Sequence, residues 1–337
     1  MLMLSSRLPR YALHMARKST ILGLTGWLPF QGRERLEQTL EALYDLHVRE
    51  FRTVFSWADW EREGGEAWFN TVAKSLGEVP RLRVLPIFTA TPQKRSMKDS
   101  RGARKSSYPP EELSSYAAFV RTMIDRYGDL FDTVELWREP NSRTHWEWKL
   151  DEDGARFAVM AMEAAKSARS LKKKIALGAL SPLDLTYLSR MDAWGLLAHI
   201  DAVSFLYSPS TREREGYALA DEVRALRALI RGLGHTSEVW FCGTGTSARA
   251  DNGSDESAHE ARQMEHFDDI RGLSVDRVYW SALHDTKDGT ATGYGLLRVD
   301  GTKNRCMSIG NALANVSSSE PSRGRPARSV RRGRACR

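Results

Sequence analysis

Runs of apolar, β-branched and aromatic residues of strand length recur eight times along the chain, each bounded by polar residues. The eight runs are residues 19–27, 51–57, 82–90, 132–137, 174–180, 201–207, 238–244 and 276–283. Most of them are apolar at successive rather than alternate positions, which is typical of strands buried on both faces of a parallel sheet. We therefore expect eight buried, parallel strands.

Between these runs the apolar positions recur every three or four residues, which predicts amphipathic helices. The clearest helical segments are residues 33–47, 109–128, 155–171 and 220–234. In the first segment Leu36, Leu40 and Leu43 fall on one face. The second opens on two prolines and closes on Gly128, as helix boundaries commonly do. Strands that alternate with helices in this way predict a parallel sheet covered by helices.

Eight strand–helix units in roughly 300 residues match a closed (β/α)₈ barrel better than an open, doubly wound sheet. An open sheet that binds a dinucleotide carries a G-x-G-x-x-G turn after its first strand, and "GLTGWLPFQG" does not supply one. We predict an α/β protein with a single (β/α)₈ TIM-barrel domain over residues 19–316. A basic N-terminal extension (1–18) precedes it, and a disordered, Arg-rich tail (317–337) follows it.

The 337-residue chain has a net charge of +7, and this charge is concentrated at its two ends. The tail 317–337 carries +6 and residues 1–20 carry +4, so the body carries about −3. A basic tail can bind nucleic acid or an anionic surface, but this one accompanies no base-reading module. It also lacks the apolar residues that would order it, so we expect a solvated end and no nucleic-acid partner.

The three cysteines, Cys242, Cys306 and Cys336, show no CxxC or Cys/His spacing, which argues against a disulfide framework and a structural zinc site. The first 20 residues contain scattered basic residues and no continuous apolar segment of the kind found in signal peptides. No stretch approaches the roughly 18 apolar residues of a membrane span. These features predict a soluble, cytoplasmic protein without a metal or a cofactor, and they leave its oligomeric state open.

Aromatic residues are frequent at the predicted strand ends, which is where barrels of this class place their reactive side chains. Trp57, Tyr207 and Trp280 all lie at or near the end of a predicted strand. Sugar rings present apolar C–H faces that stack on aromatic rings, and their hydroxyl groups bind charged and amide side chains. The pattern favours a carbohydrate ligand; the alternative is that these rings only cover the core.

The segment "RYGDLFDTVELWREPN" (126–141) resembles the fourth strand of the retaining glycoside hydrolases of clan A, which include β-xylosidases. Their usual pattern there is an apolar strand followed by Trp-Asn-Glu-Pro-Asn. "EVWFCGTGTSA" (238–248) resembles their seventh strand, "FRTVFSW" (51–57) their second and "DRVYWSAL" (276–283) their eighth. The similarity extends over about residues 20–315. It implies a glycosidase-type barrel that acts on the O-glycosyl bonds of a carbohydrate.

Retaining glycoside hydrolases use one carboxyl group to protonate the leaving oxygen and a second, about 5–5.5 Å away, to attack the anomeric carbon. The resemblance places Glu139 at the acid/base position; the alternative is a strand-end carboxylate paired with Arg138 or Arg52. The resemblance and the positions of the strand ends imply that seven residues bind the substrate: Arg52, Trp57, Arg138, Asn141, Tyr207, Trp280 and Asp285.

Three positions depart from the family pattern. Gly243 stands where the family has its nucleophilic glutamate, and glycine has no oxygen with which to attack. Arg138 replaces the asparagine that precedes the acid, and Leu206 replaces a histidine of the sixth strand. The resemblance therefore leaves two functions open. One is a glycoside hydrolase, and the other is a catalytically inactive barrel that binds a carbohydrate or an anionic nucleotide-sugar in polysaccharide metabolism.

These departures would also change the charge of the site. In the family pattern Arg52 neighbours the nucleophilic carboxylate, so Gly243 would leave Arg52 without a partner, and Arg138 adds a second positive charge. Two positive charges beside Glu139 would favour its ionised form, which cannot donate a proton. A positively charged pocket would instead suit an anionic sugar.

Asp285 follows the eighth strand and is the best positioned of the remaining acids to replace the missing carboxylate. An inverting mechanism needs only a base that activates water, with the two carboxyl groups about 6.5–9.5 Å apart. The alternative is a loop acid that caps a turn with Thr286. On the first interpretation the barrel could hydrolyse its substrate despite Gly243.

Two loops on the same side of the barrel carry further candidate residues. The loop 91–110 is long and rich in lysine and arginine, which predicts either a lid that binds an acidic ligand or a solvated loop. Trp146 and Trp148 follow the fourth strand, and they either line a sugar subsite or pack the loop against the barrel rim.

Overall fold

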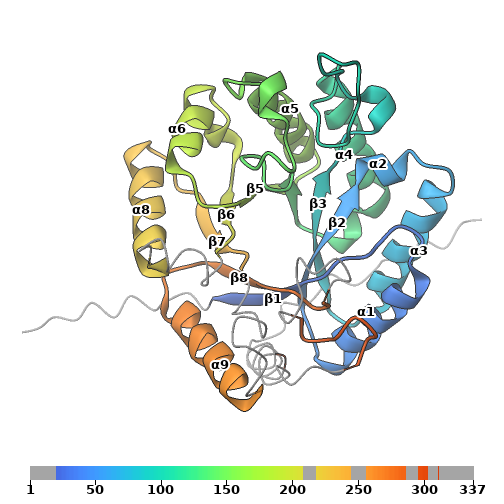
Figure 1. Ribbon diagram of the computed structural model, residues 1–337, viewed down its shortest axis with the longest axis vertical. Helices are drawn as coiled ribbons and strands as arrows, with labels where there is room; N and C mark the ends of the chain where they lie inside the picture. Colours follow the sequence, from blue (N-terminus) through green and yellow to red (C-terminus); the bar gives the residue numbers. More distant parts are fainter. Residues whose placement is uncertain (1–19, 208–217, 244–255, 286–294, 303–309, 311–337) are drawn as a thin grey trace, which may run out of the picture.

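The eight predicted strands form one closed, parallel barrel in the computed structural model, which describes residues 20–207, 218–243, 256–285, 295–302 and 310 (Figure 1). The strands are β1 (Ile21–Thr25), β2 (Glu50–Ser56), β3 (Arg83–Thr89), β4 (Thr133–Leu136), β5 (Lys174–Leu180), β6 (Ala202–Phe205), β7 (Glu238–Phe241) and β8 (Arg277–Ser281). Each strand pairs with the next, and β8 pairs with β1. The predicted (β/α)₈ TIM barrel is therefore confirmed.

The helices surround the barrel (Figure 1). They are α1 (Arg33–Asp45), α2 (Trp57–Trp60), α3 (Gly65–Glu78), α4 (Ser114–Tyr127), α5 (Ala155–Ser170), α6 (Leu185–Ala193), α8 (Leu219–Gly232) and α9 (Glu256–Gly272). Short 3₁₀ helices are η1 (Gln93–Arg95), η2 (Gly128–Leu130), η3 (Trp148–Leu150) and η4 (Leu197–His199). No helix in the described part of the chain has both the length and the apolar content that crossing a membrane requires.

Helix α4 begins at Ser114, five residues later than the prolines at which the sequence predicted its start. The backbone N–H of Met97 donates to the carbonyl oxygen of Pro109 (2.8 Å), and that of Glu111 donates to the carbonyl oxygen of Arg95 (2.9 Å). The two prolines therefore lie in an extended segment that pairs with the loop after β3. This pairing gives part of the 91–110 loop a fixed conformation.

The interior of the barrel is filled by side chains from alternate strand positions, as the twofold period of a strand requires. Leu85, Ala176, Ala179, Ala202, Trp240, Cys242 and Tyr279 form one buried cluster there. A larger core lies between the strands and the helices, and it holds most of the phenylalanines and tryptophans. The side of a strand on which an aromatic residue falls therefore decides whether it faces the interior or the helices.

The N-terminal end of the barrel contains a buried carboxylate that joins three strands. Glu50 of β2 is 3.1 Å from Arg277 of β8 and 3.2 Å from Arg83 of β3. Burial raises the pKa of Glu50, and the two arginines act in the opposite direction. This group lies at the opposite end of the barrel from the strand ends considered below.

Several features predicted from the sequence lie outside the described residues. They are the basic extension (1–18), the Arg-rich tail (317–337), Cys306 and Cys336. Cys242 is a free, buried cysteine.

Candidate functional site

The chain turns sharply after β4, and this turn brings Glu139 to the C-terminal end of the barrel. Trp137 and Glu139 have positive φ angles of 69° and 45°. This region costs a non-glycine residue about 1–3 kcal/mol, and residues that occupy it cluster at functional sites. A Cβ atom on Gly178 of β5 would overlap the carbonyl oxygen of Trp137. The turn therefore depends on a glycine in the neighbouring strand.

The Glu139 carboxylate contacts two side chains from its own loop, and its side chain is 14% exposed. The Nε of Arg138 donates to one oxygen (3.1 Å), and the Nδ1 of His145 lies 3.5 Å from the other. Burial lowers the pKa of His145, and the charge of Arg138 lowers it further. His145 is therefore neutral near pH 7, so Arg138 is the charged partner of Glu139. The guanidinium of Arg138 also lies 4.0 Å from the ring centre of Trp27.

Arg52 is bound to a carboxylate that the sequence analysis did not single out. Its Nε and Nη2 donate to the two oxygens of Glu135, at 2.8 and 2.5 Å, inside the barrel. Glu135 also accepts the N–H of Ala179 (3.1 Å). Burial alone would lower the pKa of Arg52, but the attraction of Glu135 outweighs it and the pKa is raised. The expectation that Arg52 lacks a partner is therefore wrong, because the partner comes from β4.

The end of β7 presents a thiol and a glycine. Cys242 faces the barrel interior, and burial raises the pKa of its thiol to about 12, although Arg52 acts in the opposite direction. A thiol with this pKa is protonated at neutral pH and is a poor nucleophile. A Cβ atom on Gly243 would overlap the ring of Phe241, which packs against Phe205. The position that the resemblance assigns to a nucleophile has no side-chain oxygen, and any side chain there would require the Phe241 ring to move.

Three predicted sugar-stacking rings lie among the helices instead of at the barrel mouth. Trp57, Tyr207 and Trp280 are only 2%, 1% and 1% exposed. Trp57 stacks on Phe119 of α4 at 5.7 Å, and the rings of Tyr207 and Trp280 lie against α9. We correct their assignment as substrate-binding residues, because none of the three has a ring face available to a ligand.

Asn141 and Asp285 stabilise loops near the mouth. The amide of Asn141 donates to the carbonyl oxygen of Pro182 (2.8 Å) and accepts the N–H of Ser181 (2.9 Å). It thus ties the loop after β4 to the end of β5. Asp285 is 6% exposed and accepts the N–H of Gly295 (2.8 Å). Thr286, with which the turn-capping alternative pairs Asp285, lies outside the described residues.

The basic loop 91–110 forms ion pairs with the protein's own carboxylates. Lys94 and Arg95 contact Glu61 at 2.9 and 2.6 Å, and Arg104 contacts Glu111 at 2.7 Å. These pairs reduce the charge that an acidic ligand would meet. The structure thus gives these three basic residues a role in holding the loop.

The two tryptophans after β4 differ in exposure. Trp146 is buried at 3% and packs edge-on between Trp137 and Phe157, as the packing alternative predicted. Trp148 is 37% exposed. The guanidinium carbon of Arg143 lies 4.8 Å from the centre of its ring.

Within the described residues, the charged groups at and below the mouth form two ion pairs, Arg138–Glu139 and Arg52–Glu135. His145 lies beside the first pair and Cys242 beside the second. No group of three or more histidine, cysteine, aspartate or glutamate side chains in this part of the chain could hold a metal ion. The set can exchange hydrogen bonds with hydroxyl groups, and it carries no net charge to attract an anion.

Sequence reasoning missed Glu135, Cys242 and His145. A signal existed for Glu135, because an acid within an apolar strand is seldom buried without a partner, and Arg52 lies in another apolar strand. His145 lies in a loop, where no periodic pattern indicates which way a side chain points.

No protein-family profile and no curated protein matches this chain. Solved structures do match it. A family 39 β-xylosidase from Caulobacter crescentus has a TM-score of 0.63 and 15% identity, over 90% of this chain and 72% of that one. A family 39 enzyme from Xanthomonas axonopodis pv. citri has a TM-score of 0.64 and 14% identity, over 90% of this chain and 67% of that one.

A family 1 β-glucosidase from Thermotoga maritima has a TM-score of 0.59 and 12% identity, over 89% of this chain and 97% of that one. At these identities the similarity establishes the fold alone. The resemblance to the clan A glycoside hydrolases is confirmed at that level: the chain has their eight-stranded parallel barrel.

Proposed function

We propose that this protein binds a carbohydrate at the mouth of the barrel and acts on its O-glycosyl bonds, with Glu139 as the acid/base. The observation that carries the proposal is the position of Glu139. It lies three residues after the end of β4, it is held in a positive-φ turn, and its carboxylate is partly exposed beside Arg138 and His145. The solved structures with this fold that are described as a β-xylosidase and a β-glucosidase support the same class of ligand.

The balance of charge favours a neutral sugar over a nucleotide-sugar. Arg52 is neutralised by Glu135, and Arg138 is neutralised by Glu139 while that carboxyl group is ionised. To act as the acid, Glu139 must first take up a proton, which leaves Arg138 with one positive charge. A neutral saccharide needs hydrogen-bonding groups and an aromatic surface, which Glu139, Arg138 and the 38% exposed Trp27 supply.

A second candidate function is carbohydrate binding without cleavage, and the end of β7 favours it. A retaining mechanism requires a second carboxylate close to the first. Gly243 supplies none, and the adjacent Cys242 carries a protonated thiol at neutral pH. On this second proposal Glu139 would accept hydrogen bonds from sugar hydroxyl groups and would transfer no proton.

One experiment separates the two functions. Wild-type protein and Glu139→Gln are assayed on 4-nitrophenyl β-xyloside and β-glucoside, and binding of the methyl glycosides is measured in parallel. Glu78→Gln, on the exposed end of α3, is the matched control. If Glu139 is the acid/base, its substitution lowers turnover at least about a hundredfold and the control does not.

Equal rates for wild type and Glu139→Gln would remove Glu139 from any mechanism. Binding of the methyl glycosides without any turnover by the wild type would support the second function. Absence of both binding and turnover would contradict both proposals.

A further inference from the structure

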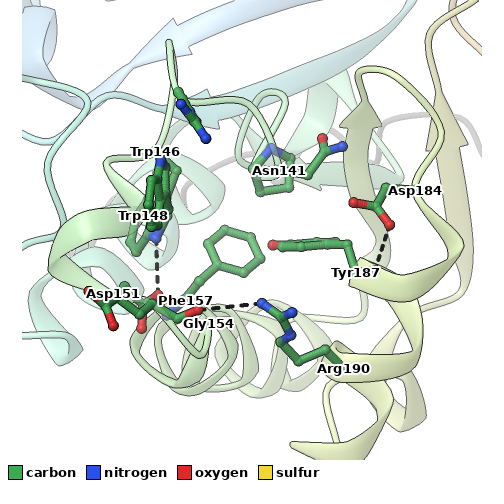
Figure 2. A pocket seen from close by; sticks show the side chains of 12 residues that line it. Asn141, Trp146, Trp148, Asp151, Gly154, Phe157, Asp184, Tyr187 and Arg190 are labelled. Atoms are coloured by element: carbon green, nitrogen blue, oxygen red, sulfur yellow. Dashed lines mark hydrogen bonds between the residues drawn. The ribbon is translucent and has the colours of Figure 1, made fainter.

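A separate cavity lies outside the barrel, between the loop after β4 and helices α5 and α6 (Figure 2). Its volume is about 230 Å³, and we call it the side pocket. It begins at Pro140, immediately after Glu139, and its aromatic lining comes from Trp146, Trp148, Phe157 and Tyr187. The side pocket therefore adjoins the mouth along the chain but is built from different side chains.

Most polar groups that line the side pocket already have partners. The Asp151 carboxylate accepts the indole N–H of Trp146 (3.0 Å) and the backbone N–H groups of Arg156 and Phe157 (2.9 Å each). The amide of Asn141 is bound to the end of β5. These groups define the shape of the pocket and have little capacity left for a ligand.

The hydroxyl of Tyr187 is the exception. It is buried, and no described residue forms a hydrogen bond with it. Figure 2 shows it directed toward the middle of the side pocket, away from the backbone of α6. Its backbone N–H, in contrast, is capped by Asp184 (2.8 Å). A buried hydroxyl without a partner destabilises a protein, so a bound water molecule or a hydroxyl group of a ligand would stabilise this one.

The remaining surface suits a neutral ring. Trp148 is exposed at the rim; the guanidinium of Arg143 covers one face of its ring, so a sugar would stack on the other face or displace Arg143. The charged lining residues are Arg143 and Arg190 together with Asp151, Glu152 and Asp184. Because acids outnumber bases, the side pocket does not attract an anion. Its volume lies below the range of about 300–1,000 Å³ that holds drug-sized ligands, so one small ring fits.

We propose that the side pocket binds a single neutral sugar unit, separately from the mouth, with the ring stacked on Trp148 and a sugar hydroxyl bonded to Tyr187. The class of ligand rests on the proposed function, whereas the location rests on the side pocket alone. A sugar held there would contact the loop whose first residues follow Glu139.

The test uses fluorine NMR of the full-length protein labelled with 5-fluorotryptophan, in which each tryptophan gives its own resonance. Substitutions Trp148→Phe and Trp27→Phe assign the two reporters among the ten tryptophans. Trp148 reports the side pocket, and Trp27, under Arg138, reports the mouth. Methyl β-xyloside and methyl β-glucoside are titrated separately. We expect the Trp148 signal to shift and saturate with at least one of them.

The two reporters separate failure of this inference from failure of the proposed function. If the Trp148 resonance shifts and the Trp27 resonance does not, the result supports sugar binding in the side pocket and contradicts sugar binding at the mouth. A shift of Trp27 alone, or no shift of Trp148 with either sugar, would overturn the side-pocket proposal.

The Tyr187→Phe variant tests the hydroxyl itself, because it removes one oxygen and leaves the ring in place. We expect the affinity measured at Trp148 to fall about tenfold and the titration at Trp27 to stay the same. Tyr44→Phe, at an exposed position of α1, is the control and should leave both affinities unchanged. An unchanged affinity at Trp148 in Tyr187→Phe would contradict the proposed hydrogen bond.

Discussion

The ends of β4 and β7 occupy equivalent places in the barrel, yet they carry different chemistry. After β4 the chain enters two positive-φ residues and presents Glu139 with a charged partner, Arg138. At the end of β7, Cys242 is buried and uncharged at neutral pH, and a side chain on Gly243 would overlap the ring of Phe241. Hydrolysis by double displacement requires two carboxylates about 5–5.5 Å apart. Of these two strand ends, only the end of β4 offers a carboxylate, although both strands keep their parallel pairing in the barrel.

The largest expected effect concerns the ion pair between Arg52 of β2 and Glu135 of β4, inside the barrel. Arg52→Met would leave Glu135 buried without its cation, and breaking a buried pair in this way costs about 3–5 kcal/mol of unfolding free energy. Urea denaturation measures the loss. The double variant Arg52→Met/Glu135→Leu should recover most of it, because neither charge then remains.

The exposed pair Arg121–Asp125 provides the control for this comparison. Arg121→Met should cost less than about 1 kcal/mol, because water solvates the aspartate that is left. If Arg52→Met cost no more than Arg121→Met, the interior pair would not be what supports the β4 side.

A matched pair of glycine substitutions tests the two strand ends directly. In Gly178→Ala the new methyl group overlaps the backbone carbonyl oxygen of Trp137. We expect the free energy of unfolding to fall by about 1–3 kcal/mol and sugar binding to weaken. In Gly243→Ala it meets the ring of Phe241, which can turn, so the loss should be smaller. Gly232→Ala, with open space around it, is the control.

Urea denaturation measures the free energy of unfolding of each variant, and sugar titration measures its affinity. A larger loss for Gly243→Ala than for Gly178→Ala would reverse the comparison, because β7 would then have the more rigid end. The result also bears on Gly243→Glu, which would place a carboxylate at this strand end, because its side chain must first displace the Phe241 ring.

A pH series extends the comparison to β8, the neighbour of β7. Burial, and then the charge of Arg35, lower the pKa of His284 to about 3, and its Nε2 lies 3.0 Å from the hydroxyl of Thr39. Below about pH 6.5 the unfolded chain gains a proton that the folded chain does not accept. Stability contributed by this residue should therefore fall as the pH drops, by at most about 1.4 kcal/mol per pH unit.

His284→Gln, which keeps a donor for Thr39 but does not titrate, should flatten this dependence in urea denaturation between about pH 7 and about pH 4. His145→Gln, on the more exposed β4 side, should flatten it less. The reverse order would show that the β4 loop, and not the β8 end, limits stability in acid.

The smallest expected effect concerns the aromatic support of Arg138. Trp27→Leu removes the ring beneath its guanidinium and should cost about 0.5–1 kcal/mol. A double-mutant cycle with Arg138→Met isolates that coupling. Phe30→Leu, beneath Arg62 at 4.4 Å, is the control: it should lose a similar amount without changing sugar affinity.

The sequence was sufficient to predict the barrel and the place of Glu139, because both depend on order along the chain. Eight apolar runs with helices between them have few other arrangements, and Glu139 directly follows the fourth run. The Arg52–Glu135 pair was not predictable in this way, because it joins residues 83 positions apart. Only the inward direction of both side chains, on strands that are not neighbours, brings them together.

The direction of the aromatic side chains was the least predictable feature. Successive strand residues point to opposite faces, so one position decides between the interior and the helices. In β8, Tyr279 points inward and Trp280 therefore points outward against α9. Both faces of a buried parallel strand are apolar, so hydrophobicity cannot distinguish them. Trp57 was misassigned for another reason: β2 ends at Ser56, so Trp57 begins helix α2 and its ring packs on Phe119 of α4.

The cluster at Glu50 has a consequence for how this barrel tolerates change. Its arginines fasten β2 to both β3 and β8, close to the seam where the first and last strands meet. These ion pairs thus hold the strands together at the N-terminal end of the barrel, opposite the C-terminal end where a ligand would bind. We therefore expect substitutions at the C-terminal strand ends to disturb the closure of the barrel less than substitutions of Glu50, Arg83 or Arg277.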